Sequence, residues 1–260
     1  MKRYRAVLTG ASGGIGREIA RVLGPHCDEL VLVGRDARRL AESAAAAGPG
    51  ARTVVADLAL PAGRDAVALP GINLLVNNAG AGAFAWLEGQ SDDALERIVR
   101  TNVLAPMQLT RLLLPELRRQ REAWIVNVGS IMGYLGYPGH AAYCATKFAL
   151  RGFSEALRRE LADSAVRVLH LAPRATRTAM NGAGVCALNA ELGVAMDEPA
   201  LVARELLALL ERPARERLLG MPERLFARLN QVLPGLIDRA LRGQLSIIRR
   251  HASASRRGIE

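Results

Sequence analysis

Residues 4–23, YRAVLTGASGGIGREIARVL, join a short apolar run to a glycine cluster and then to a helical pattern. The apolar run at 4–9 predicts a strand, and REIARVL at 17–23 predicts a helix. Glycines between them allow a tight turn and a close approach of ligand to backbone, and the helix N-terminus offers amides and a positive dipole end to a pyrophosphate. A glycine cluster alone would also fit a plain strand-to-helix turn, but this order of elements favours a nucleotide-binding unit.

Length and composition favour a single large α/β domain. The chain has 260 residues, half of them hydrophobic, and three cysteines without metal-ligand spacing. An odd cysteine count argues against a disulfide framework or a zinc site and favours a reducing compartment. No apolar run approaches the ~18 residues that span a bilayer, and the first residues reach glycines before a signal-peptide core could form. We expect a cytoplasmic protein.

The net charge of +10 is unevenly distributed. Residues 212–260 contain eleven Arg and four acidic residues and so carry +7 of it. We therefore divide the chain into a dinucleotide-binding catalytic domain at 1–211 and a basic, amphipathic helical extension at 212–260. Because the excess charge belongs to a tail and no zinc-finger or RRM-like motif is present, we expect no nucleic-acid partner.

A second predicted strand, ELVLV at 29–33, ends at Gly34-Arg35-Asp36. An NAD site commonly places an acidic residue at this strand end, whereas an Arg here can pair with the 2′-phosphate of NADP. Arg35 therefore favours NADP(H), although it would also suit a solvated position, and Arg38 and Arg39 on the next predicted helix are rival phosphate ligands. Further strands are expected at 53–56 and 72–76.

Tyr143 and Lys147 lie four residues apart in SIMGYLGYPGHAAYCATK, residues 130–147. On a helix this spacing places both side chains on one face. A nearby cation favours the phenolate and would bring the pKa of Tyr143, ordinarily near ~10, closer to neutrality, where it can donate or accept a proton. An isolated Tyr-x-x-x-Lys is more often an ordinary amphipathic helix. However, 33 of the 35 basic residues are Arg, so a retained Lys at this position indicates a chemical role.

Several motifs together resemble the short-chain dehydrogenase/reductase superfamily. They are TGASGGIG at 9–16, DL at 57–58, NNAG at 77–80, Ser130 and YCATK at 143–147, and the resemblance covers roughly residues 4–210. It implies a doubly wound, Rossmann-type α/β fold of about seven parallel strands with helices on both faces and the cofactor at the carboxyl ends of the strands.

By this resemblance, Tyr143 is the general acid in carbonyl reduction, or the base in alcohol oxidation. Ser130 would hydrogen-bond the substrate oxygen, and Lys147 would lower the pKa of Tyr143 and hold the nicotinamide ribose. Asn102 would support a water-linked proton relay. The simpler alternatives are a loop hydroxyl for Ser130 and a polar residue interrupting a helix for Asn102. No metal is implied, because Tyr143 and Ser130 polarise the carbonyl themselves.

The resemblance also implies a set of cofactor contacts. Asp57 would meet the adenine edge, 78–80 would line the adenosine side, and Thr178 would reach the nicotinamide carboxamide. The full set comprises Gly10, Ser12, Gly14, Ile15, Gly16, Arg35, Asp57, Leu58, Asn78, Ala79, Gly80, Tyr143, Lys147, Pro173 and Thr178. The chain departs from the family at Pro173-Arg174, where Pro-Gly is usual. Arg174 either points to solvent or binds an anionic part of the substrate.

Residues 177–196 fall at the family's variable substrate loop, and their apolar residues suit either a hydrophobic pocket or the core face of a short helix. The substrate is expected to be a hydrophobic ketone, aldehyde or 3-oxoacyl chain. A helix is expected to follow, with Asp197 as its N-cap and Pro199 in its first turn.

The tail carries an apolar stripe at three- and four-residue steps, which predicts amphipathic helices at 222–232 and 235–249. The stripe consists of Leu225, Leu229, Val232, Leu233, Leu236, Ile237, Leu241, Leu245 and Ile248. With arginines on the other face, residues 222–250 either bind an anionic membrane surface or pack on the body or on a second subunit. A homo-oligomer is expected.

Together these features predict an NADP(H)-dependent carbonyl reductase in which Tyr143 donates the proton. The alternative is a non-catalytic NADP(H)-binding sensor or scaffold that acts through its basic tail.

Overall fold

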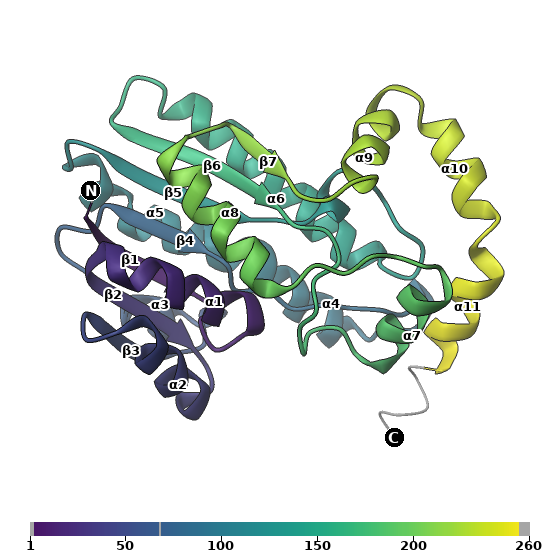
Figure 1. Cartoon of the computed structure of the whole chain (residues 1–260), viewed down its shortest axis with the longest axis horizontal. Coiled ribbons are helices and arrows are strands. Elements are labelled where there is room, and N and C mark those ends of the chain that lie inside the picture. Colours follow the sequence, from purple (N-terminus) through teal and green to yellow (C-terminus); the bar gives the residue numbers. More distant parts are fainter. Residues whose placement is uncertain (1–2, 68, 255–260) are drawn as a thin grey trace.

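A computed structural model describes residues 3–67 and 69–254 and shows one seven-stranded sheet (Figure 1). The strand order is β3-β2-β1-β4-β5-β6-β7, and every neighbouring pair is parallel. The strands are β1 (Tyr4–Thr9), β2 (Cys27–Gly34), β3 (Ala51–Val55), β4 (Leu74–Asn77), β5 (Ala123–Val128), β6 (Val166–Ala172) and β7 (Glu216–Leu218). This doubly wound sheet confirms the predicted fold. Its last strand lies beyond residue 211, within the segment expected to be a helical extension.

The helices cover both faces of the sheet (Figure 1). They are α1 (Gly14–Leu23), α2 (Ala37–Ala47), α3 (Pro61–Asp65), α4 (Asp92–Val99), α5 (Ala105–Arg118), α6 (Ala141–Glu160), α7 (Ala183–Glu191), α8 (Pro199–Glu211), α9 (Glu223–Val232), α10 (Pro234–Arg242) and α11 (Leu245–Ala254). Side chains from α1, α2 and α8 share one apolar core with the sheet, and those from α5 and α6 share the other. Successive strand residues alternate between these cores, so the central strands are mostly apolar, with Asn77, Asn127 and His170 as buried polar exceptions.

Two helix junctions place polar residues near the carboxyl ends of the strands. The Asp36 carboxylate accepts a hydrogen bond from Arg39 N at 3.0 Å and caps α2. Between α4 and α5, residues 100–104 form a π-helical turn that includes Asn102. A wide turn of this kind inside a helix is frequent at functional sites.

The helix after residue 196 differs from its prediction at the first residue. Helix α8 begins at Pro199, as expected, but its N-cap residue is Glu198 and no side chain caps it. The prediction of Asp197 as N-cap was wrong, because an Asp197 carboxylate oxygen binds Arg174 instead.

The tail forms three helices, not the two predicted. The segment expected as one helix at 235–249 is broken between α10, which ends at Arg242, and α11, which begins at Leu245. Glycine disfavours the helix interior, and Gly243 lies at the break. Figure 1 shows α9, α10 and α11 as an arm that runs from the side of β7 round to α7. We call residues 223–254 the C-terminal arm. Among the described helices, none has the length and apolar character needed to cross a membrane.

Candidate active site

The glycine loop between β1 and α1 is tightly packed. Gly10 has a φ of +66°, and a Cβ there would lie 2.7 Å from Ala79 Cα. A Cβ at Gly16 would lie 2.1 Å from Gly10 O. Only glycine fits either position without a shift of backbone.

Helix α1 begins beside this loop without a side chain over its first amides. Its N-cap is Gly13, so no side chain accepts from them. Gly14 and the partly buried Ile15 form the first turn. A helix N-terminus with free amides next to a glycine loop is a cradle for phosphate. The residues predicted to hold a dinucleotide pyrophosphate therefore fit one.

The NNAG segment is bound to the glycine loop through Thr9, which was not among the predicted site residues. Thr9 Oγ1 accepts hydrogen bonds from Asn78 N at 2.9 Å and from Ala79 N at 3.0 Å. The Asn78 side-chain amide donates to the carbonyls of Thr9 at 3.0 Å and Gly10 at 3.2 Å. The structure thus brings two of the predicted cofactor segments together. Thr9 begins the TGASGGIG motif, so the sequence contained its signal.

The predicted adenosine end of the site carries an available cation. Arg35 follows β2, is exposed, and forms no ion pair or hydrogen bond with any residue that the structure describes. The other two candidate phosphate ligands already form ion pairs: Arg38 pairs with Glu42 at 3.2 Å, and Arg39 pairs with Asp36 at 3.4 Å.

Three further predicted residues lie nearby or at the next strand end. Ser12 Oγ lies 2.8 Å from the position that a Cβ on Gly34 would occupy, so Ser12 lies directly beside the residue before Arg35. Asp57 follows β3 and accepts from Ala59 N at 2.9 Å, and Leu58 is buried beside it. Asp57 and Leu58 therefore lie just beyond the carboxyl end of β3, and Ser12 lies in the loop after β1 beside the end of β2.

Ser130, Tyr143 and Lys147 meet where β5 ends and α6 begins. A hydrogen bond joins the side chains of Ser130 and Tyr143. Lys147 Nζ lies 5.6 Å from the centroid of the Tyr143 ring and donates to Val128 O at 3.2 Å. The three predicted catalytic side chains thus form one cluster.

The pKa of Tyr143 moves in the direction opposite to the one we expected. Burial raises it to about 12, and the hydrogen bond with Ser130 opposes that rise only in part. Burial also lowers the pKa of Lys147 to about 8, because the residue is only 5% exposed and its ammonium forms no ion pair with a carboxylate in the described chain. Desolvation therefore outweighs the attraction on which the prediction was based.

Asn102 connects α6 to the NNAG loop. Its side-chain amide donates to Ala81 O at 2.9 Å and to Thr146 Oγ1 at 3.0 Å, and its Oδ1 accepts from Ala81 N at 2.7 Å. A Cβ at Gly80 would lie 3.5 Å from Asn102 Oδ1 and 3.7 Å from Lys147 Nζ. Asn102 and Lys147 therefore flank the same glycine. Thr146, which sequence reasoning missed, carries no signal apart from its place beside Lys147.

The loop after β6 lies across the same site. Pro173 O accepts from Ile131 N at 2.8 Å, which places this loop next to Ser130. Thr178 Cγ2 lies 3.0 Å from the Cβ position of Gly14, at the start of α1. Thr178 and Pro173 therefore lie between the glycine loop and the catalytic cluster.

Both alternatives considered for Arg174 were wrong. Its side chain is only 15% exposed and pairs with Asp197 at 2.7 Å and Glu223 at 3.2 Å. It also donates to Met221 O at 3.2 Å. Arg174 thus neither points to solvent nor offers a charge to a substrate, and it ties the loop after β6 to the first turn of the C-terminal arm.

Aromatic and apolar side chains surround the substrate side of Tyr143. Phe84 stacks on His140 with ring centroids 4.8 Å apart, and the His140 ring lies 6.3 Å from that of Tyr143. Burial lowers the pKa of His140 to about 4, so the ring is neutral at physiological pH. Met180, in the predicted substrate loop, lies over Gly82, with Cγ 3.1 Å from its Cβ position. No pattern in the sequence identified Phe84 or His140.

A row of buried polar side chains crosses the sheet beneath the catalytic cluster. Asn77, Asn127 and His170 are neighbours in register on β4, β5 and β6. Asn77 Nδ2 donates to Asn127 Oδ1 at 2.9 Å, Asn127 Nδ2 donates to Ser154 Oγ at 2.8 Å, and Ser154 Oγ lies 3.2 Å from His170 Nδ1. Burial and the charge of Lys147 lower the pKa of His170 to about 3. We call these four residues the polar belt.

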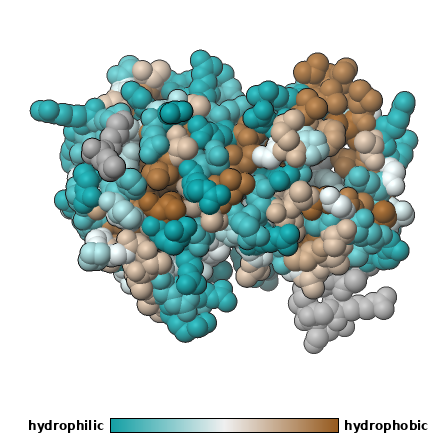
Figure 2. Space-filling view, in the orientation of Figure 1, coloured by the Kyte–Doolittle hydropathy of each residue, from teal (hydrophilic) through white to brown (hydrophobic). Residues whose placement is uncertain are grey.

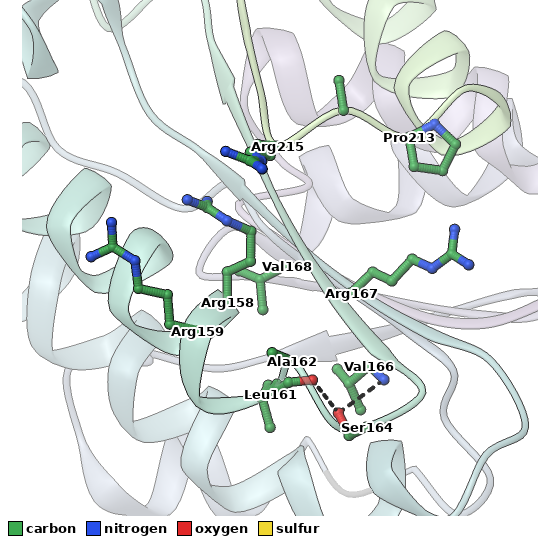
Figure 3. Close-up of a pocket in the computed structure, with 11 residues that line it drawn as sticks. Arg158, Arg159, Leu161, Ala162, Ser164, Val166, Arg167, Val168, Pro213 and Arg215 are labelled. Carbon is green, nitrogen blue, oxygen red and sulfur yellow. Dashed lines mark hydrogen bonds between the residues drawn. The ribbon is translucent and has the colours of Figure 1, made fainter.

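A hollow of about 540 Å³ lies elsewhere (Figure 3). It is bounded by the C-terminal end of α6, the start of β6 and the segment before β7, and it includes Arg158, Arg167 and Arg215. None of the catalytic cluster lines it. It is therefore separate from the candidate active site.

Comparison with known proteins agrees with this geometry. Residues 4–185 match the family model described as short chain dehydrogenase. The chain belongs to the short-chain dehydrogenase/reductase family. It is 34% identical over 258 residues to dehydrogenase/reductase SDR family member 7B of Bos taurus, across 90% of this chain and 79% of the relative.

Solved structures of the family superpose over most of this chain. A short-chain dehydrogenase/reductase from Burkholderia phymatum in complex with NAD is 25% identical, with a TM-score of 0.80 and coverage of 90% of this chain and 94% of that one. A short-chain dehydrogenase from Sphingobium yanoikuyae in complex with NADPH is 28% identical, with a TM-score of 0.74 and coverage of 95% and 96%. Family membership makes this chain an oxidoreductase.

Proposed function

We propose that this short-chain dehydrogenase/reductase uses NADP(H) to reduce a hydrophobic ketone, aldehyde or 3-oxoacyl carbonyl to the alcohol, or catalyses the reverse. The observation that carries the proposal is the cluster of Ser130, Tyr143 and Lys147 beside a glycine loop with free helix amides. The cofactor, when bound, supplies or accepts the hydride. The protein supplies the proton and orients the carbonyl.

Tyr143 is suited to act as the acid. A phenol with a pKa of about 12 keeps its proton at neutral pH, so the side chain is ready to donate to a carbonyl oxygen. The Ser130 hydroxyl would hydrogen-bond the same oxygen. Lys147 would hold the nicotinamide ribose, and its partner across Gly80, Asn102, would support the water-linked route by which the proton is replaced.

The preference for NADP(H) rests on Arg35. The solved relatives named above were crystallised with different dinucleotides, NAD in one and NADPH in the other, so they do not decide between the two. The side chain of Arg35 is exposed and unpaired within the described chain, whereas Arg38 and Arg39 already have carboxylate partners. A guanidinium in this state is available to a 2′-phosphate.

Cofactor preference tests this step directly. Because a hydrogen bond to a charged group contributes about 1.5–3 kcal/mol, Arg35→Ala should raise the KM for NADPH about tenfold to a hundredfold and leave that for NADH nearly unchanged. Arg38→Ala is the matched control and should change neither. A wild-type protein that prefers NADH would contradict the assignment.

The hydrophobic substrate class is supported by the lining of the site. Phe84, the neutral His140 ring and Met180 present apolar surface around Tyr143. Such a lining favours an acyl, steroid-like or aliphatic carbonyl over a sugar or phosphate ester.

The decisive experiment measures oxidation of NADPH with a panel of 3-oxoacyl thioesters, aliphatic aldehydes and steroid ketones. Tyr143→Phe should lower kcat about 10²- to 10⁴-fold while the affinity for NADPH persists. Tyr134→Phe removes a hydroxyl that donates to Glu216 at 2.7 Å, away from the cluster, and should keep kcat within a few-fold. NADPH binding without turnover of any substrate would favour the alternative, a non-catalytic sensor or scaffold.

A further inference from the structure

The C-terminal arm is held to the body along one side. Asn230 Nδ2 donates to Tyr134 O at 3.0 Å, and Tyr137 OH donates to Gln244 Oε1 at 3.3 Å. At the far end of the arm, Arg250 pairs with Glu191 of α7 at 2.5 Å. These contacts lie on the segment between Ser130 and Tyr143 and on the predicted substrate loop, so the inner side of the arm packs against two segments of the candidate active site.

The opposite side of the arm exposes large apolar side chains where α9 meets α10. Leu225 and Leu236 are each 55% exposed, Val232 is 77% exposed and Leu233 is 51% exposed. Met221 and Phe226 are exposed beside them. Figure 2 shows a hydrophobic area at the top right, over the α9–α10 junction of Figure 1. We call these six residues the apolar tip. Single exposed apolar residues are ordinary, but a gathered patch indicates an interaction surface.

The predicted stripe therefore divides between two surfaces. Leu229, Ile237, Leu241, Leu245 and Ile248 are buried or half-buried, whereas Leu225, Val232, Leu233 and Leu236 are exposed. Packing within the arm and against the body covers the first group. The second group is left for another partner.

Four cations on the same two helices surround the apolar tip. They are Arg224, Arg228, Arg239 and Arg242; all are exposed, and none of their side chains forms an ion pair or hydrogen bond with a residue that the structure describes. The acidic residues of these helices are Glu223, which is committed to Arg174, and Asp238. Four unpaired arginines against one uncommitted carboxylate, that of Asp238, give these two helices a net positive charge.

We propose that the apolar tip and its four arginines dock the protein on the surface of an anionic lipid bilayer. Apolar side chains at the end of an amphipathic helix pair can enter the headgroup region, while arginines around them pair with acidic headgroups, each cation contributing on the order of 1 kcal/mol. A second copy of the chain fits this surface poorly, because a symmetric contact would place the same unpaired arginines against each other.

Docking would also orient the active site. The inner side of the arm contacts Tyr134 and Tyr137, between Ser130 and Tyr143, so the arm connects the bilayer surface to the substrate wall. A hydrophobic substrate that partitions into lipid would then meet the site close to its source. This consequence depends on the proposed function, but the docking surface itself does not.

The test is sedimentation of the full-length protein with phosphatidylcholine vesicles that contain or lack phosphatidylserine. We expect binding to the anionic vesicles that weakens as salt is raised. Arg228→Glu with Arg242→Glu should lower the affinity at least about thirtyfold, the effect of losing two cations near the surface. Val232→Asp with Leu236→Asp should also abolish binding, and both positions are exposed, so the fold should tolerate the change.

The matched control reverses two arginines far from the arm. Arg167→Glu with Arg215→Glu makes the same change in net charge at the hollow of Figure 3 and should alter vesicle affinity less than about threefold. Equal losses in both charge-reversal pairs would overturn the proposal, since binding would then follow net charge alone. Failure of the wild type to bind anionic vesicles would also overturn it. So would light scattering that shows a dimer split by the Val232 and Leu236 changes.

Discussion

Replacing Lys147 by Met should stabilise the protein at pH 7 while abolishing its activity. The ammonium is buried, donates to Val128 O, and has no carboxylate partner in the described structure. Burial lowers its pKa from 10.5 to about 8, which at 1.36 kcal/mol per pH unit corresponds to a cost of about 3 kcal/mol for holding the charge in the folded state. Losing the hydrogen bond to Val128 removes about 1 kcal/mol of that gain, so we expect a net stabilisation of about 2 kcal/mol.

The sign of the pH dependence follows from the direction of the shift. Between pH 8 and 10.5 the unfolded chain keeps the Lys147 proton more tightly than the folded chain does, so this group makes stability rise with pH across that window. Below pH 8 its cost is fully present. The advantage of Lys147→Met over the wild type should therefore be largest at pH 7 and should shrink as the pH approaches 10.

Urea denaturation at pH 7, 8, 9 and 10 measures this difference. Tyr143 and Cys27 also contribute to the pH dependence of stability, because burial raises the pKa of each to about 12 in the folded chain. Both residues are present in the wild type and in the variant, so their contributions cancel in the difference. Lys147→Arg keeps its charge throughout and should show neither the stabilisation nor the pH-dependent gain. A Lys147→Met protein less stable than the wild type at pH 7, or a difference constant from pH 7 to 10, would refute the reasoning.

Three further predictions concern the packing around the site. A Cβ on Gly129 would lie 2.4 Å from His170 Nε2, so Gly129→Ala should lower the free energy of unfolding by about 1–3 kcal/mol. In a double-mutant cycle, His170→Ala should relieve most of that loss. Additive losses from the two changes would contradict the contact. His140 and His170 stay neutral in the folded chain, with pKa values of about 4 and about 3, whereas in the unfolded chain both take up protons below pH 6.5. The free energy of unfolding should therefore fall by about 2 kcal/mol per histidine from pH 6.5 to 5. His170→Gln should reduce that fall, as measured in thermal melts. Arg174→Ala should cost about 3 kcal/mol in urea denaturation by leaving the Asp197 carboxylate buried and unpaired, and adding Asp197→Asn should recover part of it.

Much of the fold was predictable because the signals that set it are local. Strand, glycine turn and helix follow one another within residues 4–23, and the alternation of elements continues to β6. The catalytic cluster was also predictable, since Tyr143 and Lys147 share one face of α6 and Ser130 follows a buried strand. In each case the positions follow from helix periodicity and from parallel strands ending at one edge.

Other features depend on contacts between distant parts of the chain, and no local pattern indicates them. The partners of Arg174 are 23 and 49 residues away, so the sequence shows a charge near the site but not that it is already neutralised. The stripe in the tail is continuous in sequence, yet a break at Gly243 turns its last third toward Tyr137. The pKa of Tyr143 could not be predicted from spacing, because burial, which depends on the whole fold, outweighs its neighbours.

The polar belt explains how the fold accommodates a buried lysine near its centre. Its members are neutral amides, a hydroxyl and an imidazole, and the charge of Lys147 helps to keep His170 unprotonated. Ser154 lies seven residues after Lys147, so one side of α6 carries the ammonium and, two turns later, the hydroxyl that joins Asn127 to His170. A second cation in the belt would be unpaired in a low-dielectric interior and would repel the ammonium of Lys147, for which we propose the ribose-binding role. Polar but uncharged side chains link the three strands without that repulsion, whereas a lysine or arginine at one of these positions would lower the pKa of Lys147 still further.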